Sequence, residues 1–111
     1  MSDAPYQVHH TGIDIGAPVG TPVHSAMTGI VQQVANSPSQ GNFVIIDHGL
    51  GVTTRYYHLN TVIAARNTAI VIGSEIGTVG STGYSTGPHL HFETRIAGIP
   101  VNPRLFLKGD P

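Results

Sequence analysis

Short apolar runs, each bounded by glycine, proline or a polar turn, follow one another along this chain of 111 residues. Runs rich in β-branched and aromatic residues between such turns predict β-strands. We expect strands in GIVQQVA (29–35), NFVIIDHG (42–49), GVTTRYYHL (51–59), VIGSEIGTVGSTG (71–83) and HLHFETRI (89–96). The second and third are expected to pair as a hairpin across HGLG.

A helical period is hard to find in the same pattern. Only LNTVIAARNTA (59–69) has room for one short helical turn, and AGIPVNP (97–103) is expected to form a final turn. The regular spacing of the turns predicts an all-β protein: a single antiparallel sheet arranged as a sandwich or barrel-like domain. We expect residues 1–111 to be one domain, with trimming of its N-terminal part left open.

The composition excludes several classes of function. Only 10% of residues are charged and the net charge is −1, so no basic surface is available for nucleic acid. Cysteine is absent, which excludes disulfides and leaves nitrogen and oxygen as the ligands for any metal. No apolar run is long enough to span a membrane, and no signal peptide is visible in MSDAPYQVHH.

Two histidines flank a single leucine in TGPHLHFE (86–93). Neighbouring side chains of a strand point to opposite faces, so we expect His89 and His91 on one face and Leu90 and Phe92 towards a core. Two imidazoles side by side suit a metal ion or acid–base chemistry, and they also suit a polar sheet face.

A possible partner for this pair lies upstream, in HTGID (10–14). Gly12 would let the backbone bend so that His10 and Asp14 converge on one point. Imidazole nitrogen and carboxylate oxygen are both good ligands for Zn²⁺. With one histidine of HLH, the set becomes two histidines and one aspartate. Three protein ligands leave a fourth position for water, as in catalytic zinc sites.

The ordered motifs HTGIDI (10–15), YYHL (56–59) and GSTGYSTGPHLHFETR (80–95) resemble the lysostaphin-type zinc metallopeptidases, bacterial and phage endopeptidases that cut peptidoglycan peptides. GTPVHSAMTGIV (20–31) and IPVNP (99–103) also fit that family. The resemblance extends from His10 to about Leu107. Each motif alone is weak, but the ordered set is specific.

The resemblance implies three zinc ligands and two catalytic histidines on an all-antiparallel β fold with a loop-walled groove. The ligands are His10, Asp14 and His91, and the catalytic residues are His58 and His89. We expect Tyr84, in the glycine-rich loop, to contact substrate from the groove wall. Glu93 shares the face of His89 and His91, and we assign it at most a supporting role behind the metal ligands.

The function that follows is zinc-dependent endopeptidase activity on bacterial peptidoglycan, in which a zinc-activated water hydrolyses a cross-bridge or stem peptide bond. We expect a monomer that acts at the cell wall as a secreted, periplasmic or phage-borne protein. The alternative is a catalytically inactive binding or activator module of the same fold, because a fold alone does not guarantee activity.

Two other classes fit less well. A biotinyl or lipoyl carrier domain, which SAMTGIV faintly suggests, needs a lysine in an exposed hairpin, and the single lysine is Lys108. A cupin-like oxygenase also uses His-x-His, but its carboxylate ligand lies downstream, whereas the best carboxylate here is Asp14. The remaining histidines, His9, His24 and His48, are expected to be surface or hydrogen-bonding residues.

Overall fold

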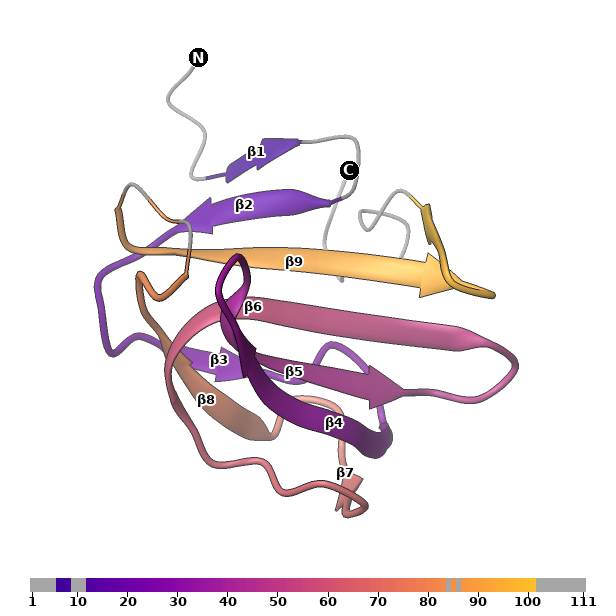
Figure 1. Ribbon diagram of the computed structural model, residues 1–111. Helices are drawn as coiled ribbons and strands as arrows, with labels where there is room; N and C mark the ends of the chain where they lie inside the picture. Colours follow the sequence, from indigo (N-terminus) through magenta and orange to yellow (C-terminus); the bar gives the residue numbers. More distant parts are fainter. Residues whose placement is uncertain (1–5, 9–11, 84, 86, 102–111) are drawn as a thin grey trace.

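A computed structural model describes residues 6–8, 12–83, 85 and 87–101 of the chain. Within these residues the chain forms ten β-strands and no helix (Figure 1). The strands are β1 (Tyr6–Val8), β2 (Ile13–Gly16), β3 (Pro22–His24), β4 (Gly29–Ser37), β5 (Gly41–Asp47), β6 (Val52–Val62), β7 (Ala69–Ile70), β8 (Glu75–Val79), β9 (His89–Ile96) and β10 (Ile99–Val101). The prediction of an all-β protein is therefore confirmed.

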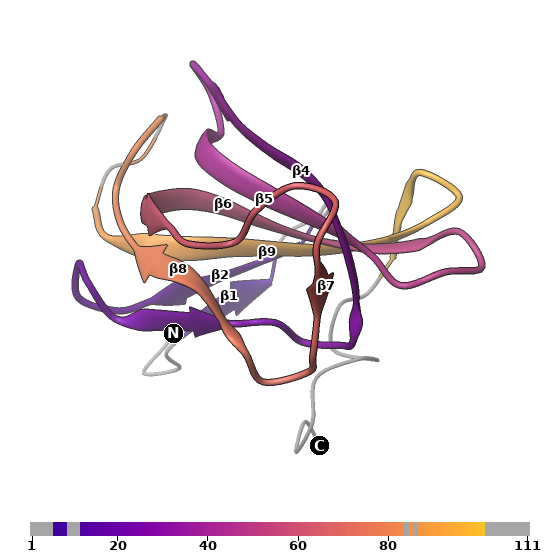
Figure 2. The same cartoon turned by 90° about the horizontal axis from the view of Figure 1, so that it is seen from below.

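One antiparallel sheet contains all of these strands. Its main path runs β1-β2-β9-β6-β5-β4-β7, while β10 pairs with β9, and β8 pairs with both β3 and β6. Figure 2 shows β3, β7 and β8 to one side of β6 and β9, with the turn between β4 and β5 and the segment after β8 rising to the other side. The domain is thus a folded-over sheet, as the sandwich prediction required, with loops bordering its open face.

The expected hairpin is present. β5 and β6 pair across the turn at His48–Gly51, where the His48 amide donates to the Val52 carbonyl over 2.9 Å. The last strand candidate, HLHFETRI, matches β9 from end to end.

One local prediction was wrong and another was confirmed in part. The expected helical turn at 59–69 is absent, because β6 continues to Val62 and a turn follows in which Asn67 has a φ of 67°. The final turn is present at Ala97 and Gly98, with φ values of 53° and 81°, and β10 then pairs back onto β9. Residues 102 and 103 of the predicted turn lie outside the described residues. At the end of β6 and in β10, pairing with a neighbouring strand extends the sheet beyond what the local sequence indicated.

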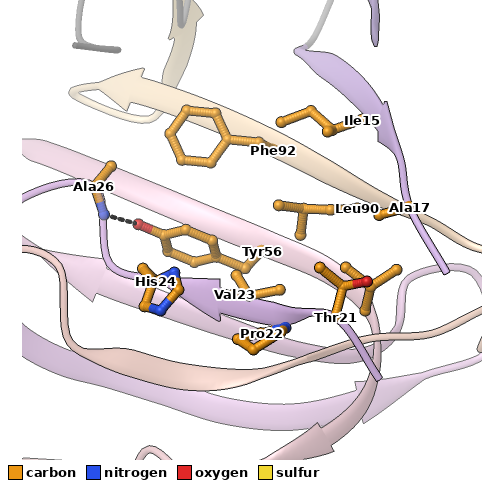
Figure 3. Close-up of a pocket in the computed structure, with 11 residues that line it drawn as sticks. Ile15, Ala17, Thr21, Pro22, Val23, His24, Ala26, Tyr56, Leu90 and Phe92 are labelled. Carbon is orange, nitrogen blue, oxygen red and sulfur yellow. Dashed lines mark hydrogen bonds between the residues drawn. The ribbon is translucent and has the colours of Figure 1, made fainter. Parts of the chain in front are cut away.

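The hydrophobic core lies between the main sheet and the layer of β3 and β8. Leu90 and Phe92 of β9 point into it, as the alternation predicted, and meet Tyr56, Val23 and Ile76. A pocket of about 300 Å³ opens into this core beside Tyr56, Leu90 and Phe92 (Figure 3). The apolar residues of β9 therefore anchor the strand from behind, while its polar residues face the other way.

A chain of hydrogen bonds closes one edge of this core. His48 Nδ1 lies 2.9 Å from the Thr28 carbonyl, so Nδ1 carries the proton and Nε2 accepts from the Thr54 hydroxyl over 2.7 Å. Thr54 in turn accepts from the Tyr56 hydroxyl at 2.8 Å, and Tyr56 accepts from the Ala26 amide at 3.0 Å. Each of these residues thus has a hydrogen-bond partner, and the expected hydrogen-bonding role of His48 is confirmed.

No helix long and apolar enough to cross a membrane occurs among the described residues.

Candidate active site

Strand register brings three polar side chains into one row on the open face of the sheet. Asp14 of β2 pairs with His91 of β9, and His91 pairs with Tyr57 of β6. Directly paired residues of antiparallel strands project from the same face. The Tyr57 ring stacks on the His91 ring at a centroid distance of 5.4 Å and an interplanar angle of 4°. Residues 77 positions apart in the sequence thus become neighbours.

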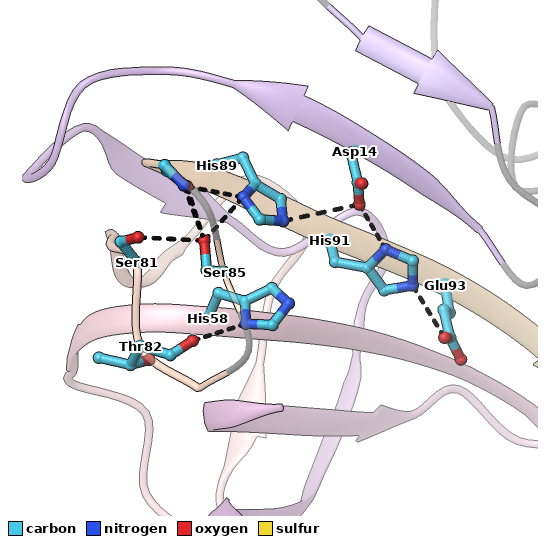
Figure 4. Close-up of polar contacts among 9 residues, drawn as sticks. Asp14, His58, Ser81, Thr82, Ser85, His89, His91 and Glu93 are labelled. Carbon is cyan, nitrogen blue, oxygen red and sulfur yellow. Dashed lines mark hydrogen bonds and ion pairs between the residues drawn. The ribbon is translucent and has the colours of Figure 1, made fainter. Parts of the chain in front are cut away.

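Both ring nitrogens of His91 face a carboxylate (Figure 4). Nδ1 lies 2.5 Å from Asp14 Oδ1, and Nε2 lies 2.9 Å from Glu93 Oε2. Glu93 is held from the other side by Arg95, whose Nη2 and Nε lie 2.8 Å and 2.9 Å from Glu93 Oε1. The orientation of the His91 ring is therefore fixed by a buried carboxylate that is itself anchored by an arginine.

The electrostatics of this cluster follow from those contacts. Burial opposes the charge on Glu93, but hydrogen bonds and charge from His91 and Arg95 outweigh it, and the pKa of Glu93 is lowered. Burial likewise opposes protonation of His91, yet hydrogen bonds to Glu93 and Asp14 raise its pKa. Without a metal, the imidazolium form of His91 is thus favoured between two carboxylates.

Close packing of β2 on β9 depends on Gly12. A Cβ atom at this position would overlap the carbonyl oxygen of Phe92 and approach the Glu93 side chain to 2.9 Å. Glycine at this position therefore permits the close approach of the two strands.

His58 reaches the same face through an irregularity in β6. The register of β5 with β6 shifts between Asn42 and Val44. His58 has a φ of 68°, a left-handed backbone conformation that is rare for residues other than glycine. Strict alternation after Tyr57 would turn His58 into the core. The bulge instead keeps both residues on the open face and returns Leu59 to the core, where it is fully buried.

The segment after β8 covers His58. His58 Nδ1 donates to the Thr82 carbonyl over 2.6 Å, since a carbonyl only accepts, and the neutral ring therefore carries its lone pair on Nε2. Burial lowers the pKa of His58 below its usual value, and the hydrogen bond to Thr82 only partly offsets this. His58 is 8% exposed. It is thus a mostly buried neutral imidazole with a defined tautomer.

His89 is held in the same way. Its Nδ1 lies 2.8 Å from the Gly87 carbonyl and 3.1 Å from Ser85 Oγ, while its Nε2 lies 3.8 Å from Asp14 Oδ1. The rings of His58 and His89 are 4.8 Å apart between centroids. Two histidines with Nδ1 bound to backbone carbonyls therefore flank the Asp14–His91 pair (Figure 4).

Four of the six site residues singled out from the sequence are brought together: Asp14, His58, His89 and His91. The other two, His10 and Tyr84, lie outside the described residues. Among the residues that are described, no group of three histidine, cysteine, aspartate or glutamate side chains is arranged to hold a metal. The expected three-ligand set stays a prediction for this reason, because it includes His10.

The described residues nevertheless have the donor chemistry of a zinc site. Asp14 Oδ1 and His91 Nδ1 point at each other, so a cation could take the place of the proton they share. The Nε2 of His91 donates to Glu93, the usual arrangement of a metal-binding histidine, whose second nitrogen is held by a carboxylate. The residues present therefore fit Zn²⁺.

Sequence reasoning did not find Thr82 or Tyr57 as residues of the site. Thr82 accepts from His58 through its carbonyl, and its hydroxyl donates to the Leu59 carbonyl over 2.9 Å. A backbone carbonyl carries no side-chain signal. Tyr57 could have been found from the sequence, because it precedes His58 in YYHL. It also lies two residues after Arg55, so the two side chains share a face of the predicted strand.

The sequence from residue 8 to residue 103 matches the profile of Peptidase family M23. The chain is 43% identical over 93 residues to the peptidoglycan DD-endopeptidase ShyA of Vibrio cholerae serotype O1. That alignment covers 84% of this chain and 22% of ShyA, so the chain spans about a fifth of the length of this curated relative.

Solved structures show the same fold. The catalytic domain of the antimicrobial peptidase lysostaphin from Staphylococcus simulans superimposes with a TM-score of 0.84 at 32% identity, covering 90% of this chain and 80% of that one. A zinc-containing peptidase from Vibrio cholerae superimposes with a TM-score of 0.81 at 36% identity, covering 88% of this chain and 33% of that one.

Proposed function

This chain belongs to peptidase family M23, and on that premise we propose that it is a zinc-dependent endopeptidase that hydrolyses peptide bonds of bacterial peptidoglycan. The observation that carries the proposal is the Asp14–His91 pair flanked by His58 and His89. ShyA, a relative at 43% identity, is a peptidoglycan DD-endopeptidase. We treat residues 1–111 as one catalytic domain that acts at the cell wall.

In this proposal Asp14 and His91 hold the zinc together with His10. The donor set of Asp14 and His91, and the carboxylate behind His91, support the assignment, as does the zinc-containing relative from Vibrio cholerae. A zinc ion bound there would polarise the peptide carbonyl and make a water molecule acidic enough to attack near neutral pH.

His58 is proposed as the general base. Its Nδ1 is bound to the Thr82 carbonyl, so Nε2 is free of a proton and can accept one from the attacking water. Burial lowers the pKa of His58 and keeps the ring neutral. A neutral imidazole is the form that a base requires.

His89 is proposed to support the other half of the reaction. When its ring is protonated, Nδ1 donates to the Gly87 carbonyl and Nε2 carries a second proton towards the space beside Asp14. From there it can stabilise the oxyanion of the tetrahedral intermediate or donate to the leaving amine. Two histidines with different roles account for a reaction that must both remove and deliver a proton.

The test is digestion of purified cell walls of several chemotypes, followed by mass spectrometry of the new peptide termini. We expect new termini with the zinc-loaded protein, and none with His89→Ala at the same zinc occupancy. The rival proposal, an inactive binding or activator module of the same fold, predicts sedimentation of the protein with the walls but no new termini. That result would replace the endopeptidase proposal.

A further inference from the structure

A second row of paired residues lies beside the row that holds His91. It runs across four strands: Gln33 pairs with Ile45, Ile45 with Arg55, and Arg55 with Glu93. Glu93 is two residues beyond His91 on β9, and residues two apart on a strand share a face. The second row therefore lies on the same open face of the sheet, one step along the strands from the candidate active site.

A groove of about 520 Å³ follows this row. Its lining residues are Gln32, Gln33, Val34, Ile45, Arg55 and Arg66. Arg66 comes from the turn between β6 and β7, which is held against β4 by hydrogen bonds from the Asn67 amide to the Val31 carbonyl, 2.8 Å, and from the Val31 amide to the Thr68 carbonyl, 2.9 Å. We call this hollow the Arg55 groove. Two arginines and no acidic residue line it.

The arginine charge in the groove is not balanced by the described part of the protein. Among the described residues, Arg95 forms an ion pair with Glu93, whereas neither Arg55 nor Arg66 forms one. The Nε of Arg55 is buried, and among the described residues it has no hydrogen-bond partner. The side chain of Arg55 is half-buried. A donor that has lost water without gaining an acceptor is suited to an incoming anion.

Arg55 also lies close to the candidate active site. Burial, followed by the charge of Glu93, raises the pKa of Tyr57, and a hydrogen bond and charge from Arg55 act in the opposite direction. The guanidinium thus lies near the hydroxyl of Tyr57, whose ring stacks on His91. A peptide positioned at His91 could therefore reach Arg55 with an anionic group of its own.

We propose that the Arg55 groove binds a free carboxylate of the substrate peptide, so that the protein prefers anionic stem peptides to neutral, glycine-type cross-bridges. This inference rests on the proposed function and names its substrate class. Residues two apart on a strand are about 7 Å apart and neighbouring strands about 5 Å, so the groove begins roughly 8 Å from His91. An extended peptide covers that distance in about two to three residues.

The experiment uses two cross-linked stem peptides with the same scissile bond. One carries its free carboxylates, and in the other these are amidated. For the zinc-loaded protein we expect kcat/KM to be about tenfold higher for the carboxylate form, the ratio that roughly 1.4 kcal/mol of selective binding produces. Arg55→Gln and Arg66→Gln should bring this ratio towards one, and Arg55→Glu should invert it. Gln32→Ala, which changes the groove without changing its charge, should keep the ratio.

A binding measurement tests the Arg55 groove independently of the proposed endopeptidase activity. Calorimetric titration with a non-cleavable stem tripeptide, as free acid and as amide, tests the groove without hydrolysis. Acid-selective binding that Arg55→Gln removes, with no cleavage of either substrate, would support the groove and overturn the proposed function. Cleavage of both substrates at equal rates, or equal binding of acid and amide, would overturn the groove. Thermal unfolding of each variant shows that it is folded.

Discussion

His58 Nδ1 lies 2.6 Å from the carbonyl oxygen of Thr82. This contact fixes which nitrogen of the proposed base carries the proton, and it ties a residue of a central strand to the segment that follows β8. Thr82 is itself held, because its hydroxyl accepts from the Asn42 amide at 3.1 Å and donates to the Leu59 carbonyl. The protonation state of the proposed base is thus determined by the packing of a loop.

Gly83→Ala should disturb that packing. A Cβ at this position would overlap the Gly41 amide and approach the Ser39 carbonyl to 2.7 Å, and the φ of 75° disfavours alanine as well. We expect the Thr82 carbonyl to shift and hydrolysis to slow by about ten- to a hundredfold with zinc bound. Gly87→Ala is the matched control, since a Cβ there meets open space. Equal rates for the two variants would contradict this account.

Changing His91 or Glu93 should distinguish the proposed zinc ligand from the carboxylate that orients it. We expect His91→Ala to lose zinc, and Glu93→Gln to bind it about ten- to a hundredfold more weakly, the usual cost of changing the group behind a ligating histidine. The measurement is a zinc competition titration with a chromogenic chelator. Wild-type affinity in Glu93→Gln would show that the carboxylate does not orient the ligand.

His58→Gly should uncouple activity from stability. Relief of the left-handed backbone at φ 68° gives about 1 kcal/mol, which partly offsets the loss of the hydrogen bond to Thr82 and of side-chain packing. We therefore expect a modest decrease in unfolding free energy, with a rate at least about a hundredfold lower. Urea unfolding and peptide hydrolysis measure the two quantities. A variant that keeps its activity would remove His58 from the mechanism.

The pH dependence of stability has a definite sign for His58. Burial lowers its pKa in the folded protein below the ordinary value of 6.5, so the unfolded chain binds more protons as the pH falls. The contribution of His58 is complete above pH 6.5 and is lost as the pH falls through the folded pKa. In chelator, the melting temperature of His58→Asn should therefore decrease less between pH 7 and pH 5. The acidic limb of the wild-type pH–rate profile should likewise lie below 6.5.

Thr54→Val should weaken the core without touching the site. The threonine hydroxyl donates to His48 and accepts from Tyr56, and Thr54 is fully buried. Valine has a similar shape but leaves both partners unsatisfied, which costs about 1–3 kcal/mol for a buried group. Chemical unfolding measures the loss, while zinc affinity should stay unchanged. A loss of zinc in parallel would mean that the two regions are coupled.

The strand that carries His89 and His91 was predictable because its alternation is strict. Leu90 and Phe92 needed a core, so the two histidines had to face the other way. The place of His58 on that face was not predictable from alternation, since it depends on a bulge and on a φ of 68° that no local sequence rule requires. The bulge depends on the register with which β6 pairs with β5.

Other features depended on contacts between distant segments. The extended form of β7 and β10 follows from pairing with β4 and β9, and local turn signals pointed elsewhere. Arg55 of β6 and Arg66 of the turn before β7 line one groove, which exists only in the folded sheet. Residue types and their spacing are visible in the sequence, whereas these features depend on neighbours that only the folded sheet provides.

The pairing of β2 with β9 has a consequence for the newly made chain. Asp14 leaves the ribosome first, and His91 follows 77 residues later. β9 must then insert between β2 and β6 before the two side chains can meet. An incomplete or misfolded chain therefore lacks the proposed zinc site, and the proposed hydrolytic activity would report that β9 has taken its place in the sheet.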